Sequence, residues 1–229
     1  MRVVHVHGAC TGAADWWWHR MVEPLRELGF GTEAVSLPSC RTKTATLHDD
    51  ADAVRAVLAA SAEPTILSGH SYGGMVITDA ATGFEPTVER LVYLAAVVPE
   101  AGRSLAEMVP EPSPWLDARE DGTVAVKPGL DLRGIFLQDC PEDLATEAAT
   151  KLTPQSAAAF ARAPRGLAWQ TIPSTYVVLT RDRATPPARQ RAWARHTTEI
   201  VEFDSGHHPF LSRPAELARL ITRRADPSP

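Results

Sequence analysis

Ser71 stands in a sequence pattern that suits nucleophilic catalysis. The segment Gly69-His70-Ser71-Tyr72-Gly73 matches G-x-S-x-G, follows an apolar run and precedes a helical one. A serine on a sharp strand-to-helix turn needs neighbours without bulky side chains two residues away, and here both are glycine. The pattern predicts Ser71 as a nucleophile whose hydroxyl projects into a cleft. The alternative is a glycine-rich turn that carries an incidental serine.

Two adjacent histidines near the C-terminus could take the proton of this hydroxyl. His207 and His208 follow the last apolar run and precede the last helical one. This loop lies at the carboxyl edge of the expected sheet, the edge that also carries Ser71. We predict His207 as the general base, since a Gly-His pair such as Gly206-His207 is the usual setting of the base beside a G-x-S-x-G nucleophile. His208 is the alternative, with lining of the pocket or solvation as its other interpretation.

An aspartate after the preceding strand would complete a triad in the chain order Ser, Asp, His. The apolar run 175–180 ends in Arg181-Asp182-Arg183. We predict that Asp182 holds the His207 tautomer and stabilises the imidazolium formed during attack. The alternative is a solvated aspartate paired with a flanking arginine, an arrangement that contributes about 0–1 kcal/mol. Asp204 is the second choice for the acid.

Two backbone amides are expected to bind the negatively charged oxygen of a tetrahedral intermediate. One belongs to Tyr72, at the N-terminus of the helix after Ser71, where the helix dipole favours negative charge. The other belongs to Ala9, because the first strand runs into His7-Gly8-Ala9 and Gly8 permits close backbone approach. Each such donor typically contributes about 2.7–4 kcal/mol of transition-state stabilisation. A plain strand-ending turn at Gly8 is the alternative.

Short apolar runs alternate with helical patterns, an order that would bring these loops together. Apolar residues at i, i+3, i+4 and i+7, as in the segment 18–25, mark one face of a helix. The alternation predicts an α/β fold with a mostly parallel central sheet and helices on both faces. The expected strands are residues 2–7, 32–36, 65–69, 88–95, 175–180 and 199–203. Helices are expected over 18–25, 49–60, 73–82, 188–195 and 213–223.

The regular alternation stops between residues 99 and 173, where prolines are frequent. A loop of that length inside a compact domain suggests a lid, and helical propensity in 141–152 and 154–162 favours a helical cap. The expected division is a core of residues 1–98 and 174–224, a cap insertion of 99–173 and a frayed tail of 225–229. Apolar cap side chains could form walls above Ser71, namely Met108, Trp115, Ile135, Phe136, Leu137 and Trp169.

Composition and charge are those of an ordinary globular protein. The chain has 229 residues, of which 44% are hydrophobic and 22% charged, which suits one domain with a substantial core. The formal net charge of −5 offers no footprint for nucleic acid or an anionic membrane, so a small neutral or apolar partner is expected. The first residues enter a strand pattern at once and no apolar run is long enough for a membrane span, so a cytoplasmic location is expected.

Neither a cofactor nor a metal is expected from the sequence. Cys10, Cys40 and Cys140 have no disulfide-framework or metal-ligand spacing, and none lies in the context of a catalytic cysteine. No pair of histidines has a convincing zinc-ligand spacing. We interpret the three thiols as reduced packing residues.

Four segments together resemble a known family. They are similar to small α/β-hydrolases, in the branch that contains plant methyl-salicylate-type esterases, hydroxynitrile lyases and their bacterial relatives. The similarity runs over nearly the whole chain and implies the α/β-hydrolase fold with a serine hydrolase of carboxylesterase type. The segments are His7-Gly8-Ala9, Gly69-His70-Ser71-Tyr72-Gly73-Gly74, Arg181-Asp182-Arg183 and Gly206-His207-His208-Pro209-Phe210-Leu211-Ser212.

Two positions depart from the lyases of this branch. Those enzymes carry a threonine directly after the early histidine and a lysine directly after the catalytic one, where this chain has Gly8 and His208. The lyase uses both side chains to handle the cyanohydrin hydroxyl and the leaving cyanide, whereas ester hydrolysis needs neither. The resemblance therefore favours hydrolysis.

The expected reaction is acyl transfer from a small-to-medium apolar or aromatic ester. Ser71 attacks the carbonyl while His207 accepts its proton, and water later releases the acyl group. The alternative is a lyase or cyclase that acts on a biosynthetic intermediate with the same fold, and a ligand-binding receptor ranks third. A homodimer is left open.

Overall fold

The computed structural model describes residues 1–109, 111 and 113–223. The predicted frayed tail at 225–229 and the last predicted core residue, 224, lie outside the described residues. Within the described part of the chain, none of the helices has the length and apolar character that crossing a bilayer requires.

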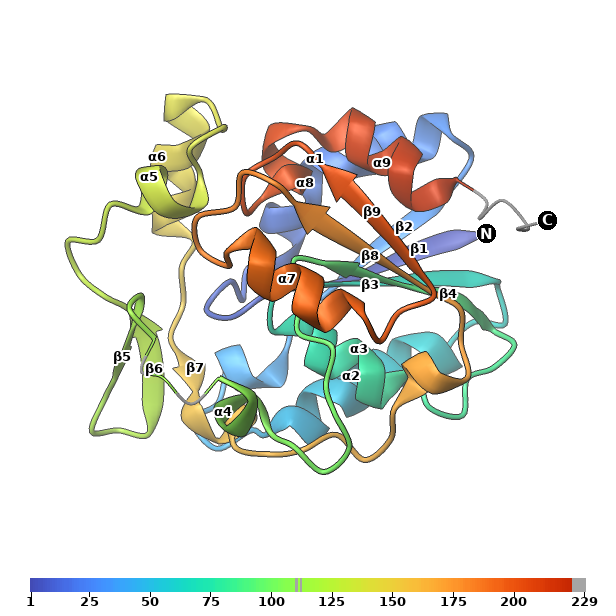
Figure 1. Ribbon diagram of the computed structural model, residues 1–229, viewed down its shortest axis with the longest axis horizontal. Helices are drawn as coiled ribbons and strands as arrows, with labels where there is room; N and C mark the ends of the chain where they lie inside the picture. The colour runs from blue at the N-terminus through green and yellow to red at the C-terminus, as the bar shows by residue number, and fades with distance from the viewer. Residues whose placement is uncertain (110, 112, 224–229) are drawn as a thin grey trace.

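A six-stranded parallel sheet forms the centre of the molecule (Figure 1). Its strands lie in the order β2-β1-β3-β4-β8-β9, and every neighbouring pair is parallel. Each predicted strand is present and agrees with the observed bounds to within one residue, so the predicted fold is confirmed. The bounds are β1 Arg2–Val6, β2 Gly31–Val35, β3 Thr65–His70, β4 Val88–Leu94, β8 Ser174–Leu179 and β9 Glu199–Phe203.

The strand order creates a crevice where the connections change direction. β2 lies on one side of β1, whereas β3 and the later strands follow on the other side. In open parallel sheets, ligands bind at such a switch point, outside the carboxyl ends of the strands. The loop after β1 carries Ala9 and the loop after β3 carries Ser71. These two strands pair directly, with Val6 opposite Gly69, so both loops meet at the crevice.

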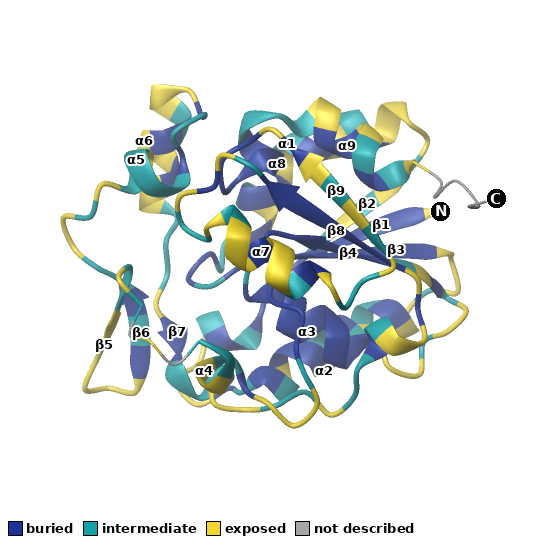
Figure 2. Cartoon of the chain, viewed as in Figure 1, coloured by how far each residue is buried: buried dark blue, intermediate teal, exposed yellow. Residues whose placement is uncertain are grey.

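Helices cover both faces of this sheet. One face carries α1 Ala14–Glu27, α8 Pro209–Ser212 and α9 Pro214–Thr222 (Figure 1). The other carries α2 Leu47–Ala59, α3 Gly73–Ala80 and α7 Pro187–Ala194, with the 3₁₀ turn η1 Pro38–Cys40 before α2. Because both faces are covered, β1, β3 and β8 are buried along their whole length, and β4 is buried from Leu91 onward (Figure 2).

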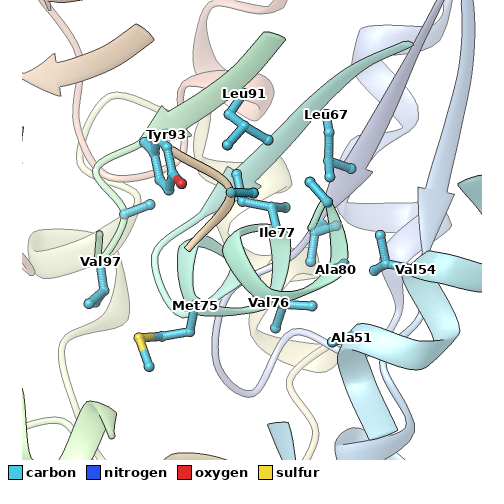
Figure 3. Close-up of a cluster of buried hydrophobic side chains, with 14 of the residues drawn as sticks. Ala51, Val54, Leu67, Met75, Val76, Ile77, Ala80, Leu91, Tyr93 and Val97 are labelled. Atoms are coloured by element: carbon cyan, nitrogen blue, oxygen red, sulfur yellow. The ribbon is translucent and has the colours of Figure 1, made fainter. Parts of the chain in front are cut away.

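The helix α3 lies at the centre of one of the two hydrophobic layers. All eight of its residues are buried. Figure 3 shows Met75, Val76 and Ile77 among side chains of the sheet and of α2. Since α3 begins directly after the turn that carries Ser71, this packing fixes the turn to the sheet.

The cap between β4 and β8 contains more strand than the sequence predicts. Besides its helices it has a separate three-stranded antiparallel sheet, which lies beside the main sheet in Figure 1. The prediction of a helix over 154–162 is wrong. The side chain of Gln155 is instead buried against the Cys10 amide and the Ser39 hydroxyl, and the backbone of Gln155 pairs with a neighbouring strand. The cap elements are α4 Leu105–Met108, β5 Leu116–Ala118, β6 Thr123–Val126, α5 Leu132–Phe136, α6 Glu142–Thr150, β7 Gln155–Ser156, η2 Ala157–Phe160 and η3 Ala168–Gln170.

His5 is a fully buried member of the first strand. Its ring stacks on Trp18 at 4.2 Å between centroids, and its Nδ1 lies 2.6 Å from the Ser68 hydroxyl. Burial lowers the pKa of His5 to about 3. The ring is therefore neutral throughout the pH range in which an unfolded histidine, with a pKa near 6.5, becomes charged.

We expect His5 to make the fold less stable in acid. Between about pH 3 and 6.5 the unfolded state binds one proton more at this residue, so the free energy of unfolding falls as the pH falls, by up to about 1.4 kcal/mol per pH unit. His5→Phe, which keeps a ring against Trp18, should reduce this slope by up to one proton in urea titrations at pH 4.5–6. The exposed His19→Phe is the control, and equal slopes in both variants would contradict the expectation.

Candidate active site

The turn between β3 and α3 holds Ser71 in a strained backbone conformation. Ser71 has a φ of +52°, a region that non-glycine residues enter at a cost of about 1–3 kcal/mol. Three backbone hydrogen bonds hold it there. The Ser71 amide donates to Leu94 O at 3.2 Å, and the Ser71 carbonyl accepts from Gly74 N and Val97 N. The end of β4 thus fixes the turn from the side.

Glycines around the turn are required by backbone crowding. A Cβ on Gly69 would lie 2.6 Å from Gly73 O, and a Cβ on Gly73 would lie 2.6 Å from Val6 O. On Gly74 it would clash with Val97 O and lie 2.9 Å from the Ala96 side chain. The first turn of α3, which begins at Gly73, therefore packs directly on the backbone of neighbouring strands.

A buried hydrogen bond joins Asp182 and His207. Asp182 Oδ2 lies 2.7 Å from His207 Nδ1, and both residues are 4% exposed. The carboxylate also accepts from the amides of Ala184 and Thr185, at 2.8 and 2.9 Å, and from Gln190 Nε2 at 3.0 Å. An ionised aspartate keeps the histidine proton on Nδ1 and leaves Nε2 able to accept one. Gln190 has no distinguishing mark in the sequence, and only the packing of α7 brings it here.

The alternatives to these two residues have other partners. His208 Nδ1 donates to Phe136 O at 3.0 Å, and burial lowers the pKa of His208 to about 3. Asp204 is largely exposed and pairs with Arg181 at 2.9 Å. The structure therefore joins His207 to Asp182, not to Asp204, and gives His208 a backbone partner.

His70, directly before Ser71, supports the His207 loop. Its Nε2 lies 2.9 Å from His207 O, and the two rings lie 4.5 Å apart. Burial, with the neighbouring histidines as further causes, lowers the pKa of His70 well below its usual range. A neutral His70 places no positive charge beside His207.

The predicted oxyanion loop packs directly against Ser71. A Cβ on Gly8 would lie 2.9 Å from His70 Nδ1 and 3.1 Å from Ser71 Cβ, so a larger residue would force these side chains to move. The next residue but one, Cys10, has a φ of +59° and donates its amide to Gln155 Oε1 at 2.9 Å. Ala9 follows Gly8 and lines the same space as Ser71.

A buried carboxylate holds the side chain of the other predicted oxyanion residue. Asp50, which is fully buried, accepts from the Tyr72 hydroxyl at 2.8 Å and from the Ser39 amide and hydroxyl at 2.8 and 2.6 Å. Burial raises the pKa of Asp50. Gln155 Nε2 bonds Ser39 Oγ at 2.9 Å, so one chain of hydrogen bonds connects the Cys10 and Tyr72 loops. Sequence reasoning missed Asp50 and Gln155, because neither lies in a motif.

Two cavities meet at Ser71. The smaller has a volume of about 60 Å³ and contains the histidine side of the site, with His70, His207 and His208 in its wall. The larger has a volume of about 470 Å³ and extends under the cap. Residues that line both are Ala9, Ser71, Val126 and Phe136.

Part of the predicted apolar cap wall is present. Trp115 and Phe136 line the larger cavity, and Phe136 and Leu137 line the smaller one. Among the described residues, the linings do not include Met108, Ile135 or Trp169. Trp169 turns away, because its indole donates to Pro99 O at 3.0 Å. Trp193 and Phe160, which the sequence did not single out, complete the larger cavity.

The three cysteines are poor nucleophiles. Burial raises the pKa of Cys10, Cys40 and Cys140 to about 12 in each case. Thiols with such pKa values stay protonated at neutral pH and react slowly.

Comparison with protein families matches residues 3–220 to the model described as alpha/beta hydrolase family. The chain belongs to the alpha/beta hydrolase family. Alpha/beta hydrolase nvfD of Aspergillus novofumigatus is 29% identical over 223 residues, which cover 90% of this chain and 89% of that protein. The carbendazim hydrolyzing esterase of Nocardioides sp. is 31% identical over 183 residues, covering 74% and 75%.

A plant methylesterase is also similar to this alpha/beta hydrolase. The pFDCC methylesterase MES16 of Arabidopsis thaliana is 26% identical over 246 residues, covering 96% of this chain and 92% of that protein. Its crystal structure has a TM-score of 0.78 at 23% identity and covers 96% of this chain and 97% of that one. The resemblance to the branch with methyl-salicylate-type esterases is thereby confirmed.

We expect Gly74→Ala to destabilise this alpha/beta hydrolase by about 1–3 kcal/mol, because the added methyl group forces α3 away from Val97 and Ala96. Gly31→Ala is the matched control. Its methyl group would meet only Arg2 Cβ at 3.6 Å, so stability should be unchanged or about 0.4–1 kcal/mol higher. Urea unfolding measures both, and equal stability of the two variants would show that α3 is not crowded as described.

Proposed function

We propose that this alpha/beta hydrolase is a serine esterase with Ser71 as nucleophile, His207 as general base and Asp182 as the acid that orients it. The observation that carries the proposal is the buried 2.7 Å hydrogen bond between His207 and Asp182, in a loop whose histidine shares a cavity wall with Ser71. Strain at the Ser71 turn supports it, since strained residues cluster at functional sites.

The reaction proceeds in two steps, acylation of Ser71 and hydrolysis of the acyl-enzyme. Ser71 Oγ attacks the ester carbonyl and its proton passes to His207 Nε2, while the amides of Ala9 and Tyr72 bind the oxyanion. His207 returns the proton to the leaving alcohol, which departs and leaves an acyl-enzyme. Water then attacks the acyl carbonyl while His207 accepts its proton, and His207 returns this proton to Ser71 Oγ as the Oγ–acyl bond breaks and the acid product leaves.

The unequal cavities favour a small alcohol group and a larger apolar acyl group. The alcohol oxygen must approach His207, because His207 protonates it, and the cavity beside His207 is the small one of about 60 Å³. The larger cavity has mainly apolar walls, including Trp115, Phe160 and Trp193, and suits a medium-sized apolar or aromatic acyl group. Methyl esters of such acids are the proposed substrates, which agrees with the methylesterase named among the relatives.

His208 occupies the position of the lysine that hydroxynitrile lyases use. With its pKa near 3 it carries no positive charge at neutral pH, so nothing at this position would stabilise a leaving cyanide. Gly8 likewise supplies no hydroxyl. Hydrolysis therefore remains the proposed reaction, ahead of the lyase, cyclase and receptor alternatives.

We expect a fluorophosphonate probe to label the wild-type protein at Ser71, and Ser71→Ala to abolish both labelling and ester hydrolysis. Loss of such a nucleophile lowers kcat by about 10⁶-fold in a serine protease. Undiminished hydrolysis by Ser71→Ala would exclude Ser71 as nucleophile.

The sizes of the two cavities predict a preference for a small alcohol group. The assay should compare methyl and butyl esters of the same aromatic acid, and kcat/KM should be higher for the methyl ester. A preference for butyl esters would overturn the assignment of the cavities.

Asp182→Asn should lower kcat by about 10⁴-fold, because an asparagine amide favours the wrong His207 tautomer, as in a serine protease with the same change. Asp204→Asn is the matched control, since Asp204 is exposed and, among the described residues, its carboxylate contacts Arg181 and Thr180 and not His207. Its kcat should stay within a factor of about two. If the two variants lost equal activity, the assignment of the acid would be wrong.

A further inference from the structure

Two consecutive cap residues contact the backbone directly before each side chain of the proposed acid–base pair. Gln138 Nε2 donates to the carbonyl of Arg181, the residue before Asp182, at 2.6 Å. Asp139 Oδ2 accepts from the amide of Gly206, the residue before His207, at 2.7 Å. Cap residues distant in the sequence thus join the loops after β8 and β9.

One carboxylate oxygen of Asp139 accepts hydrogen bonds from several groups of the His207 loop. Besides the Gly206 amide, Oδ2 accepts from Ser205 Oγ at 2.8 Å and from Ser212 Oγ at 3.1 Å. Ser205 and Ser212 lie on either side of His207 in the chain. The other oxygen, Oδ1, is buried and has no hydrogen-bond partner among the described residues. The carboxylate therefore acts here through a single acceptor with three donors.

The fit between this cap segment and the His207 loop is close. A Cβ on Gly206 would lie 2.7 Å from Gln138 Nε2 and 2.8 Å from Asp139 Oδ1, so a side chain at this position would displace the ends of both cap side chains. On either side of the pair, Leu137 and Cys140 are buried, at 3% and 5% exposure, in the hydrophobic layer that includes α8. Burial of both flanking residues fixes where Gln138 and Asp139 present their polar groups.

Further backbone contacts extend the same junction. Arg183 Nη1 donates to Gly134 O at 2.9 Å, and the neutral His208 ring bonds Phe136 O at 3.0 Å. The two loops are also joined directly, because Arg181 N donates to Ser205 O at 3.1 Å. The cap segment 134–139 thus holds residues before and after both Asp182 and His207.

We propose that Gln138 and Asp139 are positioning residues that fix the separation of Asp182 and His207. The catalytic rate of the triad would then depend on how the cap packs on the two loops that carry these residues. The proposal rests on the proposed function. Neither residue lines either cavity at Ser71, so their effect on the reaction passes through the two loops and not through contact with the substrate.

The test compares Asp139→Leu with Asp139→Asn in steady-state ester hydrolysis. Asp139→Leu keeps the shape but removes the acceptor, and kcat should fall about 10- to 100-fold with KM within about threefold, since a misplacement of about 1 Å can cost about 10²-fold. Asp139→Asn should rescue kcat to within about threefold of wild type, because its amide oxygen accepts from the same three donors. Asp143→Leu, an exposed cap residue, is the control and should behave as wild type.

Hydrogen exchange gives a readout that does not depend on activity. Amides of residues 204–208 should exchange faster in Asp139→Leu, and those of 181–183 faster in Gln138→Leu, with wild-type rates in Asp139→Asn and Asp143→Leu. Unchanged kcat and unchanged exchange in Asp139→Leu would overturn the proposal, as would a rise in KM alone, which would indicate a role in the cap wall only.

The outcomes separate this proposal from the proposed function. A wild-type protein that is not labelled at Ser71 and hydrolyses no ester refutes the esterase, whereas exchange still decides whether Asp139 holds the His207 loop. If Asp139→Leu fails to fold, Ser212→Ala and Gln138→Leu remove one bond each, and wild-type kcat and exchange in both would overturn the coupling.

Discussion

The left-handed backbone of Ser71 is the constraint on which the rest of the site depends. A serine holds a φ of +52° only because neighbouring structure compels it, and that structure comes from three strands. The end of β4 bonds the Ser71 amide and carbonyl, and the carbonyls of β1 press on Gly73. The same crowding brings Gly8 within contact of Ser71, so the turn and the oxyanion loop share one packing arrangement.

Burial gives the histidines around Ser71 different properties. His70 and His208 have backbone carbonyl partners, and burial lowers their pKa values far below neutrality. His207 alone has a buried carboxylate on Nδ1, which favours a ring that can accept a proton at Nε2. His207 thus differs from His70 and His208 in having a carboxylate, and not a backbone carbonyl, as its hydrogen-bond partner.

The cap also supplies hydrogen-bond partners to the core loops around Ser71 and His207. Gln155 bonds the Cys10 amide and, through Ser39, belongs to the network of Asp50 and Tyr72. In another part of the cap, Asp139 accepts a hydrogen bond from the Gly206 amide in the loop of His207. Both networks join cap residues to core loops, so a change on either side removes hydrogen-bond partners from the other.

The sequence by itself determined the strands, the helices of the core and the order of the loops at the carboxyl edge, because local periodicity and the glycine pattern at residues 69–74 specify them. It also singled out Ser71, His207 and Asp182 as the candidate triad, ahead of His208 and Asp204. Only the tertiary structure decided the partners: that His207 meets Asp182 and not Asp204, and that β7 replaces an expected helix. Asp50, Asp139, Gln155 and Gln190 were invisible in the sequence, because their roles arise from hydrogen bonds between residues far apart in the chain, which no local pattern records.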